Sequence, residues 1–98
     1  MSKTKGLKYD DEKPDYSLVP PNALEDAVKV LTFGAKKYAR DNWKDVDSGK
    51  ERYFAAMMRH AWAVQKGEVN DPESGLSHWA HVIANAMFLY EIHKQNKK

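Results

Sequence analysis

One stretch decides the fold class of this chain: SHWAHVIANAMFLYEIHKQ, residues 77–95. Its large apolar side chains recur three and four residues apart, which is the spacing of an α-helix rather than the alternation of a strand. The stretch therefore predicts the longest helix of the chain. We expect its broad apolar band to consist of Trp79, Val82, Ile83, Ala86, Leu89 and Tyr90. Asp71-Pro72 provides an N-cap acceptor followed by a first-turn proline, and Gly75 delays the regular helix by a few residues.

An amphipathic helix is predicted from residue 22 to about residue 38. Asn22 and Glu25 have the spacing of a capping box, in which each side chain serves an unpaired backbone donor. Apolar residues then recur at helical steps, while the charged residues lie largely off that stripe. Gly34 within this helix costs about 0.5–1 kcal/mol relative to alanine. It therefore predicts the close approach of another helix or of a ligand, with the helix contact favoured.

A further helix is predicted from about residue 49 to residue 66. Ser48 and Glu51 repeat the capping-box spacing, and Gly67 provides a stop. Four residues share one face of this helix: Tyr53, Met57, His60 and Val64. We assign Met57, Met58 and Trp62 to the core rather than to a cofactor site.

These elements predict an all-α fold, a compact bundle of three main helices with an extended N-terminal arm. The predicted single domain, residues 1–98, divides into an arm (1–19), a helical core (20–95) and a frayed tail (96–98). A chain of 98 residues has a small core and a stability of only about 5–15 kcal/mol. We therefore expect a homo-oligomer, a dimer or a tetramer.

Composition excludes several classes of protein. No apolar run approaches the roughly 20 residues of a membrane span, and no secretory signal pattern is found, so a cytoplasmic location is expected. The chain has no cysteine, so any metal must be held by oxygen and nitrogen ligands. A net charge of +2 gives no reason to expect a nucleic-acid polymer as partner. Neither a P-loop nor a dinucleotide-binding fingerprint is present.

Possible metal ligands are concentrated within fourteen residues: Glu68, Asp71, Glu73, His78 and His81. On a helix, His78, His81 and Asn85 project from one side and could converge on one ion or phosphate. Mixed carboxylate and imidazole ligands suit Mn, Co or Zn, whereas Mg usually prefers oxygen. The alternative interpretation is structural, with an N-capping aspartate, a first-turn glutamate and histidines satisfied within the core.

Phosphate- and base-binding residues are expected in two other segments. Arg59, beside His60, offers a planar donor fork for phosphate oxygens. The other segment contains Lys36 and Lys37, followed by Asn42 and Trp43. The lysines could neutralise phosphates and the aromatic residues could stack on a purine. Equally, the lysines could be solvated and Trp43 could anchor a loop.

Several motifs occur in a familiar order between residues 8 and 89: Lys8-Tyr9-Asp10, Lys13-Pro14, Leu18–Pro21, Val30–Tyr38, Asn42-Trp43, Arg59-His60, Asp71–Gly75, His78 and His81. In this order and spacing the chain resembles the phage dATP/dGTP diphosphohydrolase family. The resemblance implies hydrolysis of purine deoxynucleoside triphosphates to monophosphate and pyrophosphate with a divalent metal, Mg, Mn or Co. It also implies a role in remodelling the nucleotide pool in the host cytoplasm.

This resemblance leads to a set of expected roles. The metal ligands are Asp71, Glu73, His78 and His81; the catalytic residues are His60, which orients the attacking water, and Glu73; the substrate-binding residues are Lys36, Lys37, Asn42, Trp43, Arg59 and Asn85. The reaction is like that of MazG-type enzymes, but their E-x-x-E helix is not found in this sequence. Two alternatives therefore stay open: a protein that binds and sequesters nucleotides or nucleotide-derived signals, and a helical interaction module with structural histidines.

Overall fold

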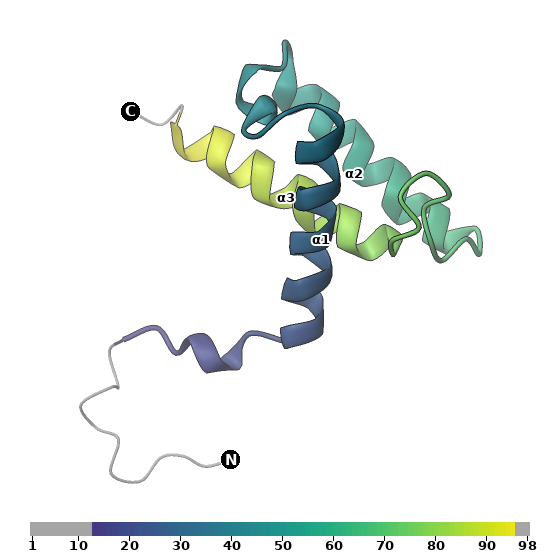
Figure 1. The fold of residues 1–98 in the computed structure, drawn as a ribbon, viewed down its shortest axis with the longest axis horizontal. Coiled ribbons are helices and arrows are strands. Elements are labelled where there is room, and N and C mark those ends of the chain that lie inside the picture. The colour runs from purple at the N-terminus through teal and green to yellow at the C-terminus, as the bar shows by residue number, and fades with distance from the viewer. Residues whose placement is uncertain (1–12, 96–98) are drawn as a thin grey trace, which may run out of the picture.

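The computed structural model describes residues 13–95, and its regular elements are helices (Figure 1). Its elements in chain order are η2 (Tyr16–Leu18), α1 (Pro21–Lys37), η3 (Asn42–Asp45), α2 (Gly49–Gln65) and α3 (His78–Gln95). The only β-type pairing within residues 13–95 is an isolated bridge between Asn70 and Ser77. The all-α prediction with three main helices is confirmed. The expected arm contains the short helix η2, while residues 1–12 and 96–98 lie outside the described part.

Helix α3 is the central element because it packs against both other α-helices (Figure 1). Its contact with α1 is centred on small side chains: Val30 of α1 clusters with Ala80 and Ala84 of α3, and Ala27 of α1 is also buried. Alanine at a helix crossing lets the two backbones approach closely. The result is a small core, in which the three alanines are at most 3% exposed.

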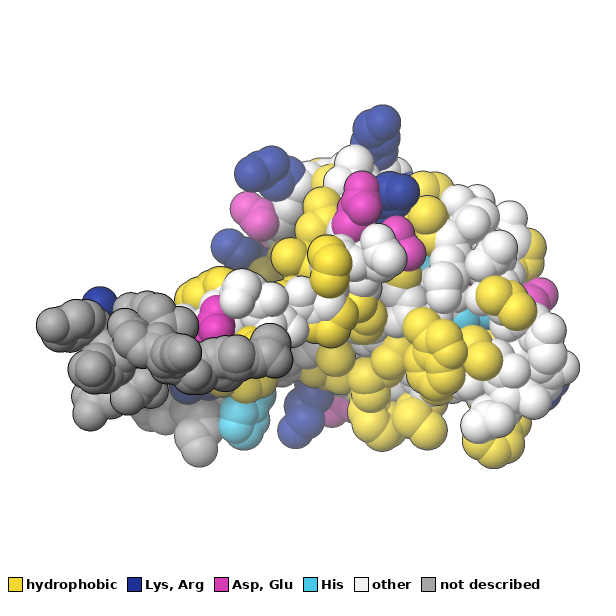
Figure 2. Space-filling model, turned by 90° about the horizontal axis from the view of Figure 1, so that it is seen from below, with side chains coloured by type: hydrophobic (Ala, Val, Ile, Leu, Met, Phe, Trp, Pro, Cys, Tyr) yellow, Lys and Arg dark blue, Asp and Glu magenta, His cyan; other side chains and the backbone are white. Residues whose placement is uncertain are grey.

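The predicted apolar band of α3 is not its buried face. The buried residues of α3 are His78, Ala80, His81, Ala84 and Asn85. Trp79 and Tyr90, which were expected in the band, are 51% and 59% exposed. The close crossing of α1 requires small side chains, so the large apolar residues flank the contact instead. Figure 2 shows groups of hydrophobic side chains on the molecular surface.

The starts of α1 and α2 differ from the predicted capping boxes. Helix α1 begins at Pro21, with Pro20 as N-cap and no side-chain cap. A proline has no N–H to be capped and its φ suits a first turn, so α1 needs no help from Asn22. Ser48 is the N-cap of α2 but is left-handed, with φ of 56°, and its side chain accepts no capping hydrogen bond.

The outer face of α2 carries apolar residues that were assigned to the core. Met57 is half-buried as expected, but Met58 and Trp62 are 47% and 62% exposed, and Phe54 is 53% exposed. The helix contact predicted for Gly34 is wrong, since no atom of another described element lies within 4 Å of a Cβ placed there; Gly34 lines a groove instead. No helix within residues 13–95 is long and apolar enough to cross a membrane.

Candidate active site: a groove with a histidine cluster at its edge

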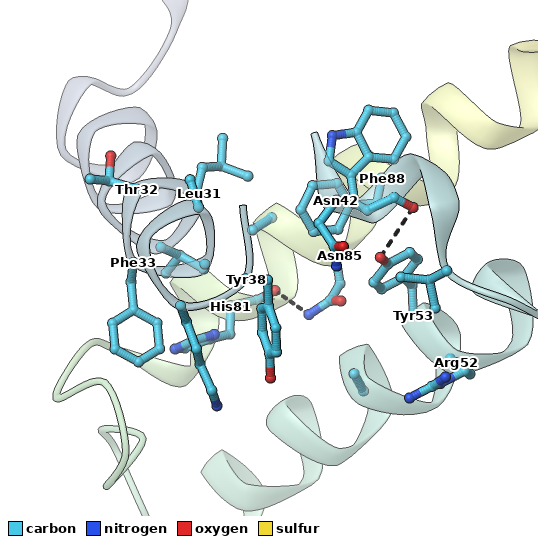
Figure 3. A pocket seen from close by; sticks show the side chains of 18 of the residues that line it. Leu31, Thr32, Phe33, Tyr38, Asn42, Arg52, Tyr53, His81, Asn85 and Phe88 are labelled. Atoms are coloured by element: carbon cyan, nitrogen blue, oxygen red, sulfur yellow. Dashed lines mark hydrogen bonds between the residues drawn. The ribbon is translucent and has the colours of Figure 1, made fainter. Parts of the chain in front are cut away.

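An open groove of about 1440 Å³ lies among the C-terminal half of α1, the loop with η3, α2 and α3. Figure 3 shows Tyr38, Asn42 and Asn85 pointing into this space from different elements. Nine of the residues expected in the site line the groove: Lys37, Asn42, Trp43, Arg59, His60, Asp71, Glu73, His81 and Asn85. His78 lies behind this wall, and Lys36 does not line the groove.

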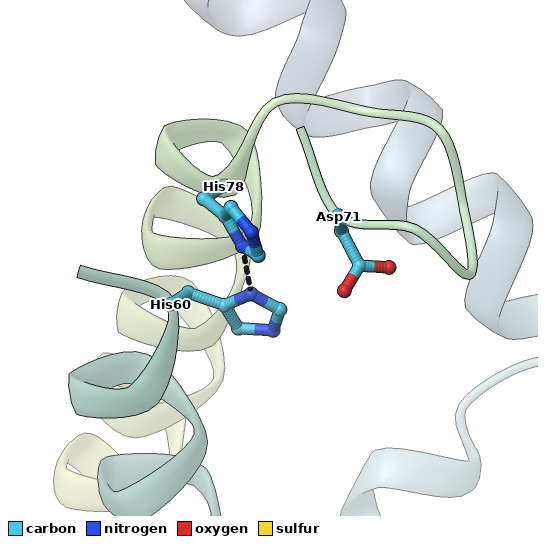
Figure 4. A group of neighbouring side chains, drawn as sticks. All are labelled: His60, Asp71 and His78. Carbon is cyan, nitrogen blue, oxygen red and sulfur yellow. Dashed lines mark hydrogen bonds between the residues drawn. The ribbon is translucent and has the colours of Figure 1, made fainter. Parts of the chain in front are cut away.

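Three histidines from two helices form a cluster at the edge of the groove. His60 on α2 faces α3, and its Nδ1 is 2.8 Å from Nδ1 of His78 (Figure 4). The ring of His60 also stacks on the ring of His81, with centroids 4.4 Å apart. His78 is 3% exposed, and its Nε2 lies 2.9 Å from Oε1 of Glu68. The packing of α2 on α3 therefore joins residues that are 18 positions apart.

The loop between α2 and α3 positions Asp71 beside this cluster. Asp71 Oδ2 accepts a hydrogen bond of 2.9 Å from the backbone N–H of Ser74, a turn in which aspartate is favoured. Asp71 thus caps a turn within the loop rather than α3, which begins at His78. Ser74 Oγ is 2.7 Å from Nε2 of His81. The same serine therefore holds both the carboxylate and the third histidine.

The group that could hold a metal ion is His60, Asp71 and His78. One ligand atom from each lies within 4.8 Å of the other two. In Figure 4 the Asp71 carboxylate, which belongs to the α2–α3 loop, lies beside the imidazoles of His60 and His78. Two residues expected as ligands have other partners, since Glu73 pairs with Lys37 and His81 with Ser74.

Burial favours the neutral form of two of the clustered imidazoles, His60 and His81. Burial, followed by the neighbouring rings of His81 and His78, lowers the pKa of His60 to about 4. Burial also lowers the pKa of His81. For Asp71, burial alone would raise the pKa, but hydrogen bonds from Ser74 and the nearby histidines outweigh it, so the pKa is lowered. At neutral pH His60 and His81 thus present nitrogen lone pairs beside the Asp71 carboxylate, which are the forms that bind a cation.

Charged side chains form the rim of the groove. Lys37 at the end of α1 forms an ion pair with Glu73 of the α2–α3 loop. Hydrogen bonding to Glu73, and then to Tyr38, raises the pKa of Lys37. Arg59 also lines the groove, as do Arg40 and Arg52. The rim therefore holds cations that could meet phosphate oxygens, although Asp41, Asp45 and Asp47 line the same groove.

Aromatic residues build the end of the groove opposite the histidines. The Trp43 ring stacks on Phe88 at 5.2 Å with an interplanar angle of 19°. Tyr53 Oη donates to the carbonyl of Trp43 at 3.2 Å. Trp43 is therefore a loop anchor as well as part of the wall. Asn85 Nδ2 donates to the His81 carbonyl at 2.8 Å, which fixes the amide within its own helix.

Four residues of the site had not been singled out from the sequence: Ser74, Phe88, and the rim arginines Arg40 and Arg52. Ser74 lies in the Asp71–Gly75 segment, one of the motifs that carry the family resemblance. Its contact with His81 could not be predicted, because it depends on how the loop turns. Phe88 is seven residues after His81, two helical turns along the same side of α3. That spacing was a signal that could have placed it beside the groove.

Fold and site define a small all-α protein with a histidine–carboxylate cluster beside a groove lined by both basic and acidic side chains. Residues 3–98 match the family described as dATP/dGTP diphosphohydrolase, N-terminal, and the chain belongs to this family. A Salmonella phage PMBT28 protein named dATP/dGTP diphosphohydrolase is 36% identical over 85 residues, which cover 87% of this chain and 29% of that relative. The chain thus spans less than a third of the relative's length. No solved structure shows a significant match.

Proposed function

We propose that this chain hydrolyses purine deoxynucleoside triphosphates, dATP and dGTP, to monophosphate and pyrophosphate within the groove, with a divalent metal. The observation that carries the proposal is the groove itself, which brings Lys37 and Arg59 to the same space as His60 and Asp71. The named activity of the phage relative supports the substrate class. Hydrolysis by a phage protein of this kind would serve to remodel the nucleotide pool in the host cytoplasm.

The residues divide the chemical work by their position. The guanidinium of Arg59 offers two parallel donors to phosphate oxygens, and the ammonium of Lys37 acts as a point charge. Water attacks the α-phosphorus, the bond between this phosphorus and the α,β-bridging oxygen breaks, and pyrophosphate leaves with that oxygen. A divalent metal supplies neutralisation of phosphate charge when bound. Glu73, released from Lys37 by an incoming phosphate, is free to accept a hydrogen bond from that water.

The base is proposed to bind at the aromatic end of the groove. Tyr38 is 62% exposed and lines the groove together with Trp43 and Asn42. Aromatic faces stack on nucleobases, with a contribution of about 1–3 kcal/mol per base. The amide of Asn42 offers both a donor and an acceptor, which suits the edge of a purine.

The test is to incubate the purified chain with each dNTP and NTP in the presence of Mg, Mn, Co or EDTA, and to separate the products by ion-exchange chromatography. Monophosphate and pyrophosphate formed from dATP and dGTP, and lost with EDTA, are the expected result. Unchanged nucleotide that co-elutes with the protein would overturn hydrolysis and leave nucleotide sequestration as the function.

We further propose that the chain forms a homodimer through the outer face of α2. Phe54, Met58 and Trp62 are spaced four residues apart and are all exposed, so they form one apolar stripe. If a second copy packs antiparallel about Met58, Phe54 of one copy lies opposite Trp62 of the other. The same arrangement places Glu51 at the start of one stripe near Lys66 at the end of the other. This charge complementarity favours a second copy as the occupant.

Light scattering coupled to size-exclusion chromatography tests the dimer. The wild-type chain should elute with twice the mass of one chain, and Met58→Asp should give one chain, because two carboxylates would meet at the symmetry axis. A variant of another exposed apolar residue, Trp79→Gln, should remain dimeric. Monomeric wild-type protein, or a dimeric Met58→Asp variant, would contradict the proposal.

A further inference from the structure

We propose that His60, His78 and Asp71 form the binding site for one transition-metal ion, with the two histidines using their Nδ1 atoms. This inference specifies the metal of the proposed function and rests on that function only for the role of the ion. The site differs from the set expected from the sequence: it includes His60 and leaves out Glu73 and His81. Its support comes from geometry, proton placement and ligand chemistry.

The geometry matches two nitrogens on one ion. Two ligand nitrogens at about 2.1 Å from one ion stand about 3.0 Å apart when they subtend about 90° at the ion and about 3.4 Å apart at the tetrahedral angle. The two Nδ1 atoms are 2.8 Å apart, and a ligand atom of Asp71 lies within 4.8 Å of both histidines. A small movement of the Asp71 side chain completes three ligands. Its loop position is held by the hydrogen bond from Ser74.

The placement of protons also favours an ion. The Glu68 carboxylate can only accept, so Nε2 of His78 carries the proton and Nδ1 of His78 has a lone pair. A carboxylate behind a histidine ligand is a recurring arrangement around metals, because it fixes the ring and its tautomer. Without an ion, Nδ1 of His60 must donate to that lone pair. With an ion, His60 takes its other tautomer and both lone pairs point at the metal.

The ligand types select a transition metal over magnesium. Two imidazoles suit Zn, Co, Mn or Fe, whereas Mg favours oxygen ligands and retained waters. His60 and Asp71 line the groove while His78 lies behind it. An ion held by these residues would therefore be reached from the groove. In this arrangement His60 would hold the ion rather than orient the water.

The test is a titration of the EDTA-treated, untagged chain with Co(II), followed by visible absorption. We expect one Co(II) per chain with the absorption bands of imidazole ligation, displacement by Zn(II), and no displacement by a hundredfold excess of Mg. His60→Gln and His78→Gln should weaken Co(II) binding at least a hundredfold. His93→Gln, an exposed histidine at the far end of α3, is the matched control and should bind like wild type.

A second variant addresses folding. Asp71→Asn keeps the size of the side chain and its acceptor for Ser74, so the variant should have the circular dichroism spectrum of the folded wild type. Even so, it should bind Co(II) more weakly than the wild type. Absence of Co(II) bands in the wild type, or equal binding by His60→Gln, would overturn the site. Co(II) binding without hydrolysis of any nucleotide would leave the site standing and overturn the proposed activity. Hydrolysis of nucleotide with Mg, without any Co(II) binding, would overturn the metal site and leave the proposed activity standing.

Discussion

The two sides of the groove are built in different ways. The histidine cluster is partly or fully buried, and each ring has partners: His78 lies between His60 and Glu68, and His81 between His60 and Ser74. The charged rim is exposed, and Lys37 is fixed there by the exposed carboxylate of Glu73. A buried, hydrogen-bonded group keeps its geometry before a ligand arrives, while an exposed ion pair exchanges partners easily. The cluster is therefore suited to chemistry and the rim to capture.

The largest effect is expected when the cluster is broken with His78→Ala. The variant removes a proposed ligand and leaves His60 and Glu68 without their partner, so dGTP hydrolysis should fall by about 10³-fold. The same change should lower the free energy of unfolding by about 2–3 kcal/mol, because a buried ring is lost. Initial rates and urea unfolding measure both. Glu68→Gln, which can still accept from His78, should lose only about tenfold in rate. A His78→Ala variant with wild-type rate would contradict a cluster that performs chemistry.

Substitutions of rim cations should change the Michaelis constant for the nucleotide and leave the free energy of unfolding almost unchanged. Lys37→Ala and Arg59→Ala should each raise KM for dGTP about tenfold, the loss expected for one charge-assisted hydrogen bond. The free energy of unfolding should stay within about 0.5 kcal/mol of wild type because both side chains act at the surface. The control is Lys29→Ala, because Lys29 lies on α1 like Lys37 but does not line the groove. A fall in kcat with unchanged KM would place these cations in the chemical step instead.

The contrast between cluster and rim also explains what could be predicted from sequence. Helices α1 and α2 end at Lys37 and Gln65, within a residue of their predicted ends, because periodicity and stop signals are local. The shared face of His78 and His81 was equally local. The pairing of His60 with His78 was not, since it depends on how α2 packs on α3. The Lys37–Glu73 pair, 36 residues apart, is likewise a tertiary contact that no spacing rule contains.

Acid should destabilise the metal-free protein through the cluster. His60 has a folded-state pKa of about 4 against an ordinary 6.5, so the unfolded chain binds the extra proton between these values. Its contribution to stability is complete above pH 6.5 and is lost as the pH falls towards 4. The lowered pKa of His81 acts in the same direction, and that of Asp71 acts at still lower pH. Urea unfolding in EDTA should show this fall, and His60→Gln should flatten it. Stability that rises between pH 6.5 and 5 would contradict buried neutral imidazoles.

The smallest effect is expected at the contact that links the rim to the loop of the cluster. In the free protein the Glu73 carboxylate forms an ion pair with the ammonium of Lys37. A triphosphate must therefore displace this carboxylate before it can bind Lys37. Glu73→Gln removes the competing charge and should lower KM for dGTP about two- to threefold, since exposed ion pairs contribute only about 0.2–1 kcal/mol. The gain should shrink in higher salt, which screens the pair.

Two measurements distinguish this competition from a direct role of Glu73. If the carboxylate only competes for Lys37, the Glu73→Gln variant keeps its kcat, and adding Lys37→Ala abolishes the gain in KM. If Glu73 accepts a hydrogen bond from the attacking water after its release, kcat falls while KM still improves. A combined fall in kcat and KM is the result we expect, because the same carboxylate would then hold the rim closed in the free protein and serve the reaction once phosphate has taken its place.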